Sequence, residues 1–521
     1  MDPESIQRRR WYILGVLVVS LLVVVLDNTV LNVALKTIAD PNVGLGATQS
    51  ELEWSINSYT LVFAGLLFTF GVIGDRIGRK RILLAGMAIF GLASLVSAYA
   101  QTPAQLIWSR ALMGLGAAAI MPQTLSIITN VFEPRERGRA IGIWSGAVGL
   151  GVAIGPVTGG LLLANFWWGS VFLINVPVVV AGMIAMFVLI PESRNPDPGG
   201  LDPIGVLLSI VGLVALSYGI IRGGEKAAWL TPAVIGPMVA GFAVLALFVW
   251  HESRIRNPAF DVRLFRDPRL SAGVGAVGMS FFAMAGVFFF TSFYMQSVLG
   301  LSPLEAGAMA LPFAAAQLIF SPVSGTMVNR FGARAVCTTG LLLAALALAG
   351  YQFIDESSPL WVLGVIFFIQ GTGMANVVPA ATESVMSALP REKAGAGSAL
   401  NNAARQVAVA MGVAVLGSVI ASVYRGEMTD RFNALPAGQR HVAAESIEGT
   451  LAVASRMGAA GQNLIEPAHA AFVQGMHLAA GVSAVVAFLG ALMVFKWMPG
   501  RRSAAPEPVM PVPERTTTPA R

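Results

Sequence analysis

Charged side chains are scarce in this sequence: Asp, Glu, Lys and Arg make up 12% of its 521 residues, while 55% of the residues are hydrophobic. A soluble globular domain needs about twice that share of charge. The composition therefore excludes a soluble protein and predicts an integral membrane protein. The net charge of +6 does not indicate nucleic-acid binding, because the basic residues form short clusters between apolar runs and no basic domain.

Cysteine and enzyme motifs are also missing. The single cysteine, Cys337, excludes an internal disulfide and a metal site built from cysteines. The sequence has no Gly-x-Ser-x-Gly, no His-Glu-x-x-His and no Walker loop. We therefore expect no enzyme activity, no catalytic residues, no metal and no cofactor. Without a site for ATP hydrolysis, uphill transport must use an ion gradient.

Long apolar runs are what the sequence has in abundance. At about 1.5 Å of rise per helical residue, about 20 residues cross the roughly 30 Å hydrocarbon layer. The first run is too long for the core of a signal peptide, so we expect it to remain as a span. We predict an all-α fold with fourteen spans, at residues 11–35, 54–74, 82–100, 104–131, 139–163, 170–190, 204–221, 231–250, 270–298, 303–328, 335–353, 361–387, 398–423 and 470–496.

Lys and Arg gather in the loops that alternating spans place on one side. These clusters are Arg8–Arg10, Arg76–Arg81, Arg135–Arg139, Arg254–Arg269 and Arg391–Lys393. The positive-inside rule assigns that side to the cytoplasm. We therefore predict a multi-pass protein of the cell (plasma or inner) membrane with both termini in the cytoplasm.

Two loop segments occur twice along the chain. The pattern Gly71-x-x-x-Asp75-Arg76-x-Gly78-x-Lys80 recurs as Gly325-x-x-x-Asn329-Arg330-x-Gly332-x-Arg334, and Pro134–Arg137 recurs as Pro390–Lys393. Each copy follows an even-numbered span, so the repeats predict two parallel six-helix bundles with the transport site between them.

The repeats and the polar linkers give the expected domain organisation. It consists of a cytoplasmic N-terminus at 1–10, a first bundle at 11–190, linkers with the inserted spans seven and eight at 191–269, a second bundle at 270–497 with a long outer loop at 424–467, and a disordered cytoplasmic tail at 498–521. No role for the outer loop or for the inserted spans follows from the sequence.

Asp27 is an acid inside the first apolar run, in the stretch Leu26-Asp27-Asn28-Thr29-Val30-Leu31-Asn32. An acid inside the bilayer costs at least about 2.5 kcal/mol, so it indicates a functional site with a partner. A polar contact that only holds helices together is the alternative.

Arg110, in span four, is the second charge inside the membrane. Span one leaves Asp27 roughly 12 Å from its outer end, and span four leaves Arg110 roughly 9 Å from the same side, so we expect the two charges to pair. The arginine favours an ionised carboxylate and burial favours a protonated one, and these opposed effects predict an acid that exchanges a proton. A static salt bridge is the alternative.

Span five carries Gly151, Gly155 and Gly159 at a spacing that places them on one helix face, with Pro156 beside them. Small residues let another helix approach closely, and a proline removes one backbone hydrogen bond. Packing alone would also explain this stripe. The loop after span two, with Gly71, Asp75, Arg76, Gly78 and Lys80, is expected to contact the N-terminus of a neighbouring helix when the inner face is closed.

The second half offers weaker candidates. Glu383 and Arg405 lie at comparable depths near the inner ends of spans twelve and thirteen, so they form a possible second charged pair, with snorkelling toward the interface as an equal alternative. We interpret His477 as a helix contact rather than a proton relay. Residues that could line a cavity for flat, lipophilic cations are Asn28, Asn32, Trp54, Asn57, Tyr59, Phe281, Phe282, Phe289, Phe293, Tyr294, Gln296 and Gln370.

These motifs together resemble those of the major facilitator superfamily. Gly71–Arg81 resembles its signature loop between spans two and three, Arg110–Gly116 its fourth-span motif, and Gly146–Gly160 the fifth-span motif of its antiporters. Leu26–Leu35 is similar to the first-span motif of its fourteen-span drug:proton antiporters. The resemblance covers all fourteen spans.

The resemblance implies a role for each matching position. It links Asp27 and Arg110 to proton coupling, Asp75 and Arg76 to gating, and Gly155 and Pro156 to antiport.

Three positions depart from the pattern. Lys36 stands where a proline is usual, Met113 where a glutamine is common, and Asn329 in place of the acid of the second loop repeat. The last departure predicts that the gating charge is concentrated in the first half.

The sequence thus predicts a proton-coupled exporter that works by alternating access and moves amphipathic, cationic or aromatic drugs outward. Its partners would be the small-molecule substrate, protons and the lipid bilayer, with no nucleic acid and a monomer as the working expectation. An exporter of a lipid or a self-made metabolite on the same fold is the alternative. A facilitative importer should not need the span-five pattern, and a membrane sensor should carry a soluble signalling domain, which these residues do not contain.

Overall fold

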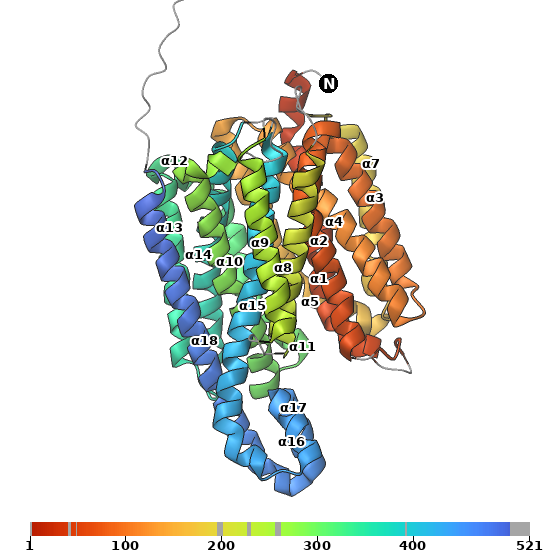
Figure 1. Ribbon diagram of the computed structural model, residues 1–521, viewed down its shortest axis with the longest axis vertical. Coiled ribbons are helices and arrows are strands. Elements are labelled where there is room, and N and C mark those ends of the chain that lie inside the picture. Colours follow the sequence, from red (N-terminus) through yellow and green to blue (C-terminus); the bar gives the residue numbers. More distant parts are fainter. Residues whose placement is uncertain are drawn as a thin grey trace, which may run out of the picture.

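The protein is a bundle of long helices that run along one common axis (Figure 1). The computed structural model describes residues 3–39, 43–47, 49–194, 202–226, 231–255, 262–390 and 393–500, and within these ranges every regular element is a helix. The predicted all-α fold is therefore confirmed. We call the face at which α1 begins and α18 ends the terminal face.

The first half of the chain packs around one hydrophobic core, which includes Leu17, Phe90, Leu125, Ile141 and Phe172. Its helices are α1 (Pro3–Ala39), α2 (Gln49–Ile77), α3 (Arg79–Ala98), α4 (Pro103–Val131), α5 (Pro134–Asn165), α6 (Ser170–Leu173) and α7 (Asn175–Leu189). Helix α1 thus includes residues 3–10, which the sequence assigned to a separate N-terminal segment.

The sixth predicted span is divided into α6 and α7. The interruption falls at Ile174, and α7 then begins with Asn175. Pro177, the third residue of α7, has no N–H to donate to the preceding turn. This break places the polar Asn175 side chain in the interior of the first half, where it is buried.

The second half has its own core, which includes Phe290, Leu341, Phe367, Leu416 and Met476. Its elements are η1 (Val262–Arg266), α10 (Pro268–Phe293), the π-helical turn η2 (Tyr294–Val298), α11 (Pro303–Ala308), α12 (Leu311–Phe331), α13 (Ala333–Gly350), η3 (Tyr351–Phe353), α14 (Leu360–Ser387), α15 (Ala394–Asn433) and α18 (Gln462–Trp497).

The two inserted helices lie across the boundary between the halves (Figure 1). Helices α8 (Pro203–Lys226) and α9 (Pro232–Glu252) pack tightly on each other, and α8 contacts α2 from the first half and α15 from the second. At one of these contacts a Cβ added to Gly65 of α2 would lie 2.6 Å from a methyl group of Val214. The insert therefore covers one side of the crossing of α2 and α15.

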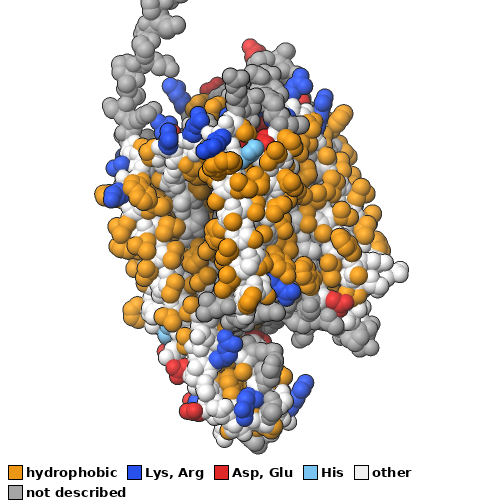
Figure 2. Space-filling model, viewed as in Figure 1, with side chains coloured by type: hydrophobic (Ala, Val, Ile, Leu, Met, Phe, Trp, Pro, Cys, Tyr) orange, Lys and Arg blue, Asp and Glu red, His pale blue; other side chains and the backbone are white. Residues whose placement is uncertain are grey.

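The surface matches a membrane protein. Side chains around the middle of the molecule are almost entirely hydrophobic, and charged side chains gather toward its two ends (Figure 2). Thirteen helices within the described ranges are long and apolar enough to cross a membrane, and α5, with 32 residues, corresponds to the remaining predicted span. A continuous apolar belt of this kind needs lipid around it.

The predicted outer loop at 424–467 is largely helical in the described residues. Helix α15 continues to Asn433, α16 (Ala437–Glu445), α17 (Ile447–Met457) and η5 (Gly458–Gly461) follow, and α18 starts at Gln462. Tyr424, Met428 and Phe432 recur every four residues and are buried, and the Tyr424 hydroxyl donates to Thr450 over 2.6 Å. The resulting hairpin projects from the end opposite the terminal face (Figure 1). Residues 501–521 of the predicted tail lie outside the described residues.

Candidate functional site

Asp27 and Arg110 form an ion pair inside the first half. Both side chains are almost completely buried, and an Nη1 atom of Arg110 donates to Oδ2 of Asp27. Asp27 comes from α1, well past the middle of that helix, and Arg110 from α4, so the depth argument from the sequence places them correctly. The pair compensates two charges that would each be costly alone in a medium of low dielectric.

A second partner of Asp27, Asn175, was not predicted. Its Nδ2 donates to Oδ1 of Asp27 over 3.2 Å and lies 3.1 Å from the hydroxyl of Ser94. Ser94 in turn donates to the Phe172 carbonyl over 2.9 Å. Asn175 opens a helix directly after a break within an apolar run, and that position is the signal that could have found it.

Arg110 has partners besides the carboxylate. Its Nε donates to the Ser55 carbonyl over 3.3 Å, and its guanidinium carbon lies 4.4 Å from the centre of the Tyr59 ring. The Met113 sulfur, at a position where a glutamine is common, lies 3.7 Å from Nη1. Nη2 has no hydrogen-bond partner among the described residues. Part of the arginine's donor capacity is therefore unused in this conformation.

The polar stretch around Asp27 reaches Tyr59 as well. Asn28 donates to the Tyr59 hydroxyl over 3.1 Å and to the Val24 carbonyl over 3.0 Å. Two members of the predicted cavity lining thus meet beside the ion pair. The side chain of Asn32 lies outside the described part of the structure.

The glycine stripe of α5 faces α1 next to the ion pair. A Cβ added to Gly151 would lie 2.8 Å from Val25, one at Gly155 1.8 Å from the Thr29 hydroxyl, and one at Gly159 3.2 Å from Val30. Such distances leave no room for a side chain at the first two positions. The stripe therefore sets the contact between α5 and the segment of α1 that carries Asp27. Pro156 lies within α5, and its side chain is outside the described part.

Asp75 joins the two halves at the terminal face. Its Oδ1 accepts hydrogen bonds from Arg79, at 2.9 and 2.7 Å, and from the backbone N–H of Gly395 at 3.0 Å, while Oδ2 accepts from Ala396 at 3.2 Å. Gly395 and Ala396 open α15, so a carboxylate of the first half caps a helix of the second half. The predicted contact with a helix N-terminus is present. Arg79 was missed, although its spacing of four residues from Asp75 indicates an ion pair on one helix face.

The glycines of this loop let neighbouring segments pack closely against α2 and the turn that follows it. A Cβ at Gly71 would lie 2.6 Å from that of Ala399, so α2 and α15 touch there. Gly78 has φ 131°, which favours glycine, and a Cβ there would meet the Glu192 carboxylate at 2.6 Å. The Lys80 ammonium donates to the Phe187 carbonyl over 2.8 Å, and Arg76 is half-buried near the end of α2. These residues fix the turn between α2 and α3.

The equivalent contact in the second half lacks an acid from the loop. A Cβ at Gly325 would lie 2.5 Å from the Gly138 backbone at the start of α5, so α12 approaches α5 as α2 approaches α15. Asn329 stands where the first half has Asp75. The carboxylate of Glu383, from α14, lies at the same contact, 2.5 Å from a Cβ added to Gly138, and Arg137 is its electrostatic partner.

Glu383 and Arg405 do not pair with each other in the part of the chain that the structure describes. Glu383 faces the start of α5, whereas the Arg405 guanidinium lies 5.5 Å from the centre of the Phe281 ring. Their depths along the helices are comparable, but the two side chains point from α14 and α15 toward different neighbours. The proposed second charged pair is therefore wrong for this conformation.

The remaining members of the predicted cavity lining are scattered. Trp54 and Gln296 are exposed, and the Tyr294 hydroxyl donates to the Asp355 carbonyl over 2.6 Å as part of the second core. Asn57, Phe282 and Phe293 are half-buried, and the Phe289 side chain lies outside the described part. Gln370 is buried in α14, and both of its amide atoms lack a hydrogen-bond partner among the described residues. The list is thus not one continuous lining.

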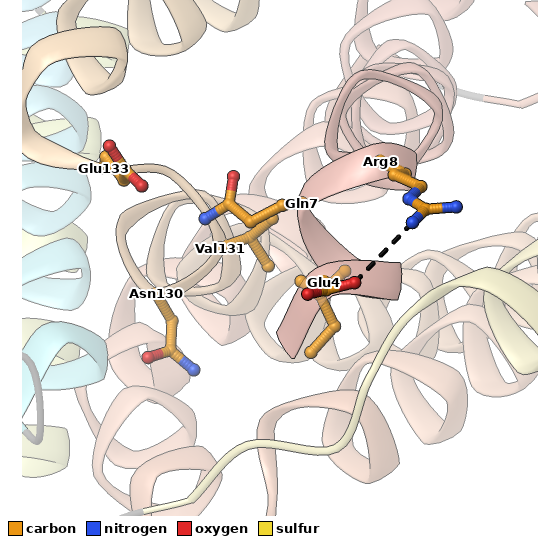
Figure 3. A pocket seen from close by; sticks show the side chains of 7 residues that line it. Glu4, Gln7, Arg8, Asn130, Val131 and Glu133 are labelled. Atoms are coloured by element: carbon orange, nitrogen blue, oxygen red, sulfur yellow. Dashed lines mark ion pairs between the residues drawn. The ribbon is translucent and has the colours of Figure 1, made fainter. Parts of the chain in front are cut away.

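Two further features lie outside the site. His477 contacts the Ile354 carbonyl over 2.7 Å, as expected for a helix contact. A pocket of about 660 Å³ at the terminal face, lined by Glu4, Ile6, Gln7, Arg8, Asn130, Val131 and Glu133, contains none of the predicted site residues (Figure 3). Its Glu4–Arg8 ion pair, at 3.6 Å, is highly exposed.

Two helical halves that meet at one face, with a buried acid–arginine pair inside one of them and an apolar belt around both, define a multi-pass membrane transporter. The sequence profile of the Major Facilitator Superfamily matches residues 17–413. The chain belongs to this superfamily, as its motifs predicted. Because the superfamily consists of transporters, the predicted transporter function, as opposed to an enzyme, is also confirmed.

Relatives with related functions cover most of the chain. The chain is 33% identical to the multidrug efflux pump LfrA of Mycolicibacterium smegmatis, over 93% of this chain and 96% of that protein. It is 35% identical to the methyl viologen resistance protein SmvA of Salmonella typhimurium, over 82% and 85%. It is 34% identical to the tetracenomycin C resistance and export protein of Streptomyces glaucescens, over 98% and 96%. The predicted class of drug efflux transporter agrees with these relatives.

The fold is also that of a solved structure. The crystal structure of the human organic anion transporter TETRAN matches 94% of this chain and 99% of its own, with a TM-score of 0.63 at 16% identity. At that identity the match concerns the fold.

Proposed function

We propose that this protein is a proton-coupled antiporter that exports amphipathic aromatic compounds, with Asp27 as the group that carries the proton. The single observation that carries the proposal is the buried contact of Asp27 with Arg110 and Asn175. A carboxylate that is held by a cation and an amide, away from water, has a partner for its ionised form and a low-dielectric site for its protonated form. It can therefore change its proton when the site opens to either side.

The conformation fits one end state of alternating access. Asp75, Arg79 and the start of α15 hold the two halves together at the terminal face, and Gly138 and Gly325 touch at the same face. We infer that the terminal face is cytoplasmic, from its Lys and Arg clusters, in a plasma or inner membrane. The conformation is then closed toward the cytoplasm, and breaking the Asp75 contact is part of opening inward.

The cargo follows from the relatives rather than from the site. A multidrug efflux pump, a methyl viologen resistance protein and a tetracenomycin C export protein share about a third of their residues with this chain. We infer that this protein handles drug-like molecules in the same direction, as a monomer in the lipid bilayer. An exporter of a lipid or a metabolite on this fold stays a possible alternative, and the experiment below separates the two.

Reconstituted protein tests the proposal. Purified protein in liposomes is given fluorescein, rhodamine 123 or ethidium, with and without an imposed pH gradient. We expect at least one dye to move against its gradient only when the pH gradient is present and to stop when a protonophore is added. If no dye moves while an imposed pH gradient drives a lipid probe across the bilayer, the protein is not a drug antiporter.

A further inference from the structure

One arginine in the second half is buried without a counter-charge. Arg405 lies in α15, and its side chain is 7% exposed. Among the residues that the structure describes, no salt bridge or hydrogen bond engages its guanidinium, and its guanidinium carbon lies 5.5 Å from the Phe281 ring centre. A ring face compensates a buried cation only in part, so this charge calls for a further partner.

The surroundings of Arg405 belong to both halves. Helix α15 packs on α2 and α4 of the first half and on α10 and α14 of the second. In the first half, the guanidinium carbon of Arg110 lies 4.4 Å from the centre of the Tyr59 ring of α2. Nη2 of Arg110 also lacks a hydrogen-bond partner among the described residues.

The guanidinium keeps its donors available. A guanidinium that stacks on an aromatic ring uses its flat face, while its N–H groups point outward in the plane of the group. Those N–H groups match the two oxygens of a carboxylate or a single anionic oxygen better than any other side chain does. No carboxylate of the described residues pairs with Arg405, and Asp27 is already held by Arg110 and Asn175.

We propose that Arg405 binds the acidic group of an aromatic substrate, a carboxylate or an ionised phenol or enol, at the boundary between the halves. The proposal rests on the proposed function and names the substrate class of that transport site. It departs from the sequence-based expectation of cationic cargo, because a cation at this place would meet the unpaired positive charge of Arg405. Phe281, already against the guanidinium, would contact the aromatic part of the ligand.

Binding of two dyes with one scaffold tests the proposal. Fluorescein and rhodamine 123 share a xanthene core with a phenyl substituent, but fluorescein is an anion and rhodamine 123 a cation at neutral pH. Affinities are measured by fluorescence anisotropy with purified full-length protein in nanodiscs, for the wild type, Arg405→Gln and Arg405→Lys. Arg425→Gln is the matched control, since Arg425 lies in the same helix but is exposed near the outer hairpin.

We expect the wild type to bind fluorescein at least tenfold more tightly than rhodamine 123, and Arg405→Gln to lose that preference through a weaker affinity for fluorescein. Arg405→Lys should restore part of it, because the charge is kept, and Arg425→Gln should match the wild type. A tenfold change in Kd corresponds to about 1.4 kcal/mol. An unchanged preference in Arg405→Gln, or a wild type that binds no fluorescein, would overturn the proposal and leave Arg405 a structural residue.

The liposome assay separates this inference from the proposed function. Proton-driven transport of rhodamine 123 without any of fluorescein would uphold the antiporter and contradict the acidic substrate. A charge preference in binding that depends on Arg405, without transport of either dye under a pH gradient, would uphold the substrate class and contradict the antiporter.

Discussion

At the scale of single residues, the proposed proton site is built from one acid and two unlike donors. Arg110 supplies a charge and Asn175 an amide, and they come from α4 and α7. The arginine stabilises the ionised carboxylate, whereas an amide can donate to a carboxylate or accept from a carboxylic acid. Asn175 can therefore hold the side chain of Asp27 in place in both protonation states, which a proton carrier requires.

Removing this amide should weaken the coupling between dye export and the proton gradient. We expect Asn175→Ala to lower proton-driven dye efflux about tenfold, because a hydrogen bond to a charged group contributes about 1.5–3 kcal/mol. Dye exchange without a pH gradient should change much less, since it needs no proton transfer. Asn165→Ala is the matched control, as Asn165 is exposed at the end of α5. An equal loss in both assays would assign Asn175 to folding alone.

Much of this site could be predicted from the sequence, and the two parts that failed have different causes. Counting residues from a helix end gives depth, and depth was enough to pair Asp27 with Arg110. Depth does not give the rotation of a helix about its axis, so Glu383 and Arg405 appeared to be a pair although they point toward α5 and α10. Asn175 was missed because residues 170–190 are predicted as one continuous span, whereas the helix breaks at Ile174, directly before Asn175.

At the scale of elements, α5 is held against two partners by different glycines. Gly151 and Gly155 touch α1 next to Asp27, while Gly138 and Gly142 touch α12 of the second half. A movement of the halves that shifts α12 against α5 must therefore act on the helix that packs against the segment of α1 with Asp27. This arrangement gives a physical route between the boundary of the halves and Asp27.

A bulky residue in the stripe should interrupt that route. We expect Gly155→Leu to insert in the membrane but to lose more than nine-tenths of transport, since a Cβ there would lie 1.8 Å from the Thr29 hydroxyl. Gly160→Leu is the matched control, because nothing lies within 4 Å of a Cβ at Gly160. Transport is measured as dye efflux from liposomes with equal amounts of protein. Full activity of Gly155→Leu would reduce the stripe to packing without a role in transport.

At the scale of the whole molecule, the two halves of the chain meet at the terminal face, and the inserted helices α8 and α9 cover one side of the crossing of α2 and α15. A small apolar cluster that includes Phe68 and Val72 of α2, Val385 of α14 and Ala399 of α15 accompanies the Asp75 contact. The all-α fold and the span positions followed from the length and spacing of the apolar runs. The helices of the hairpin at 424–467 did not, because α16 and α17 have only 9 and 11 residues, and helices that short form by packing on their neighbours.

Loss of the Asp75 contact should open the terminal face. We expect Asp75→Asn to weaken a cap that contributes about 0.5–2 kcal/mol, which increases the inward-open population several-fold. This population is measured by electron paramagnetic resonance, as the distance between spin labels at Arg81 and Phe331, which are both exposed at the terminal face. The single cysteine, Cys337, is buried and is replaced by alanine first. If Asp75→Asn gives the same distance distribution as the protein with Asp75 intact, Asp75 does not hold the terminal face closed.

The most direct test of the account is proton release on substrate binding. Purified protein in weakly buffered solution is mixed with the dye that the wild type transports best, and the pH change is recorded for the wild type and for Asp27→Asn. The substitution keeps the shape of the side chain and removes its titration. We expect a stoichiometric release of protons from the wild type and at least a tenfold smaller release from Asp27→Asn, at comparable dye binding. Release from Asp27→Asn equal to that of the wild type would contradict the assignment of Asp27 as the proton carrier.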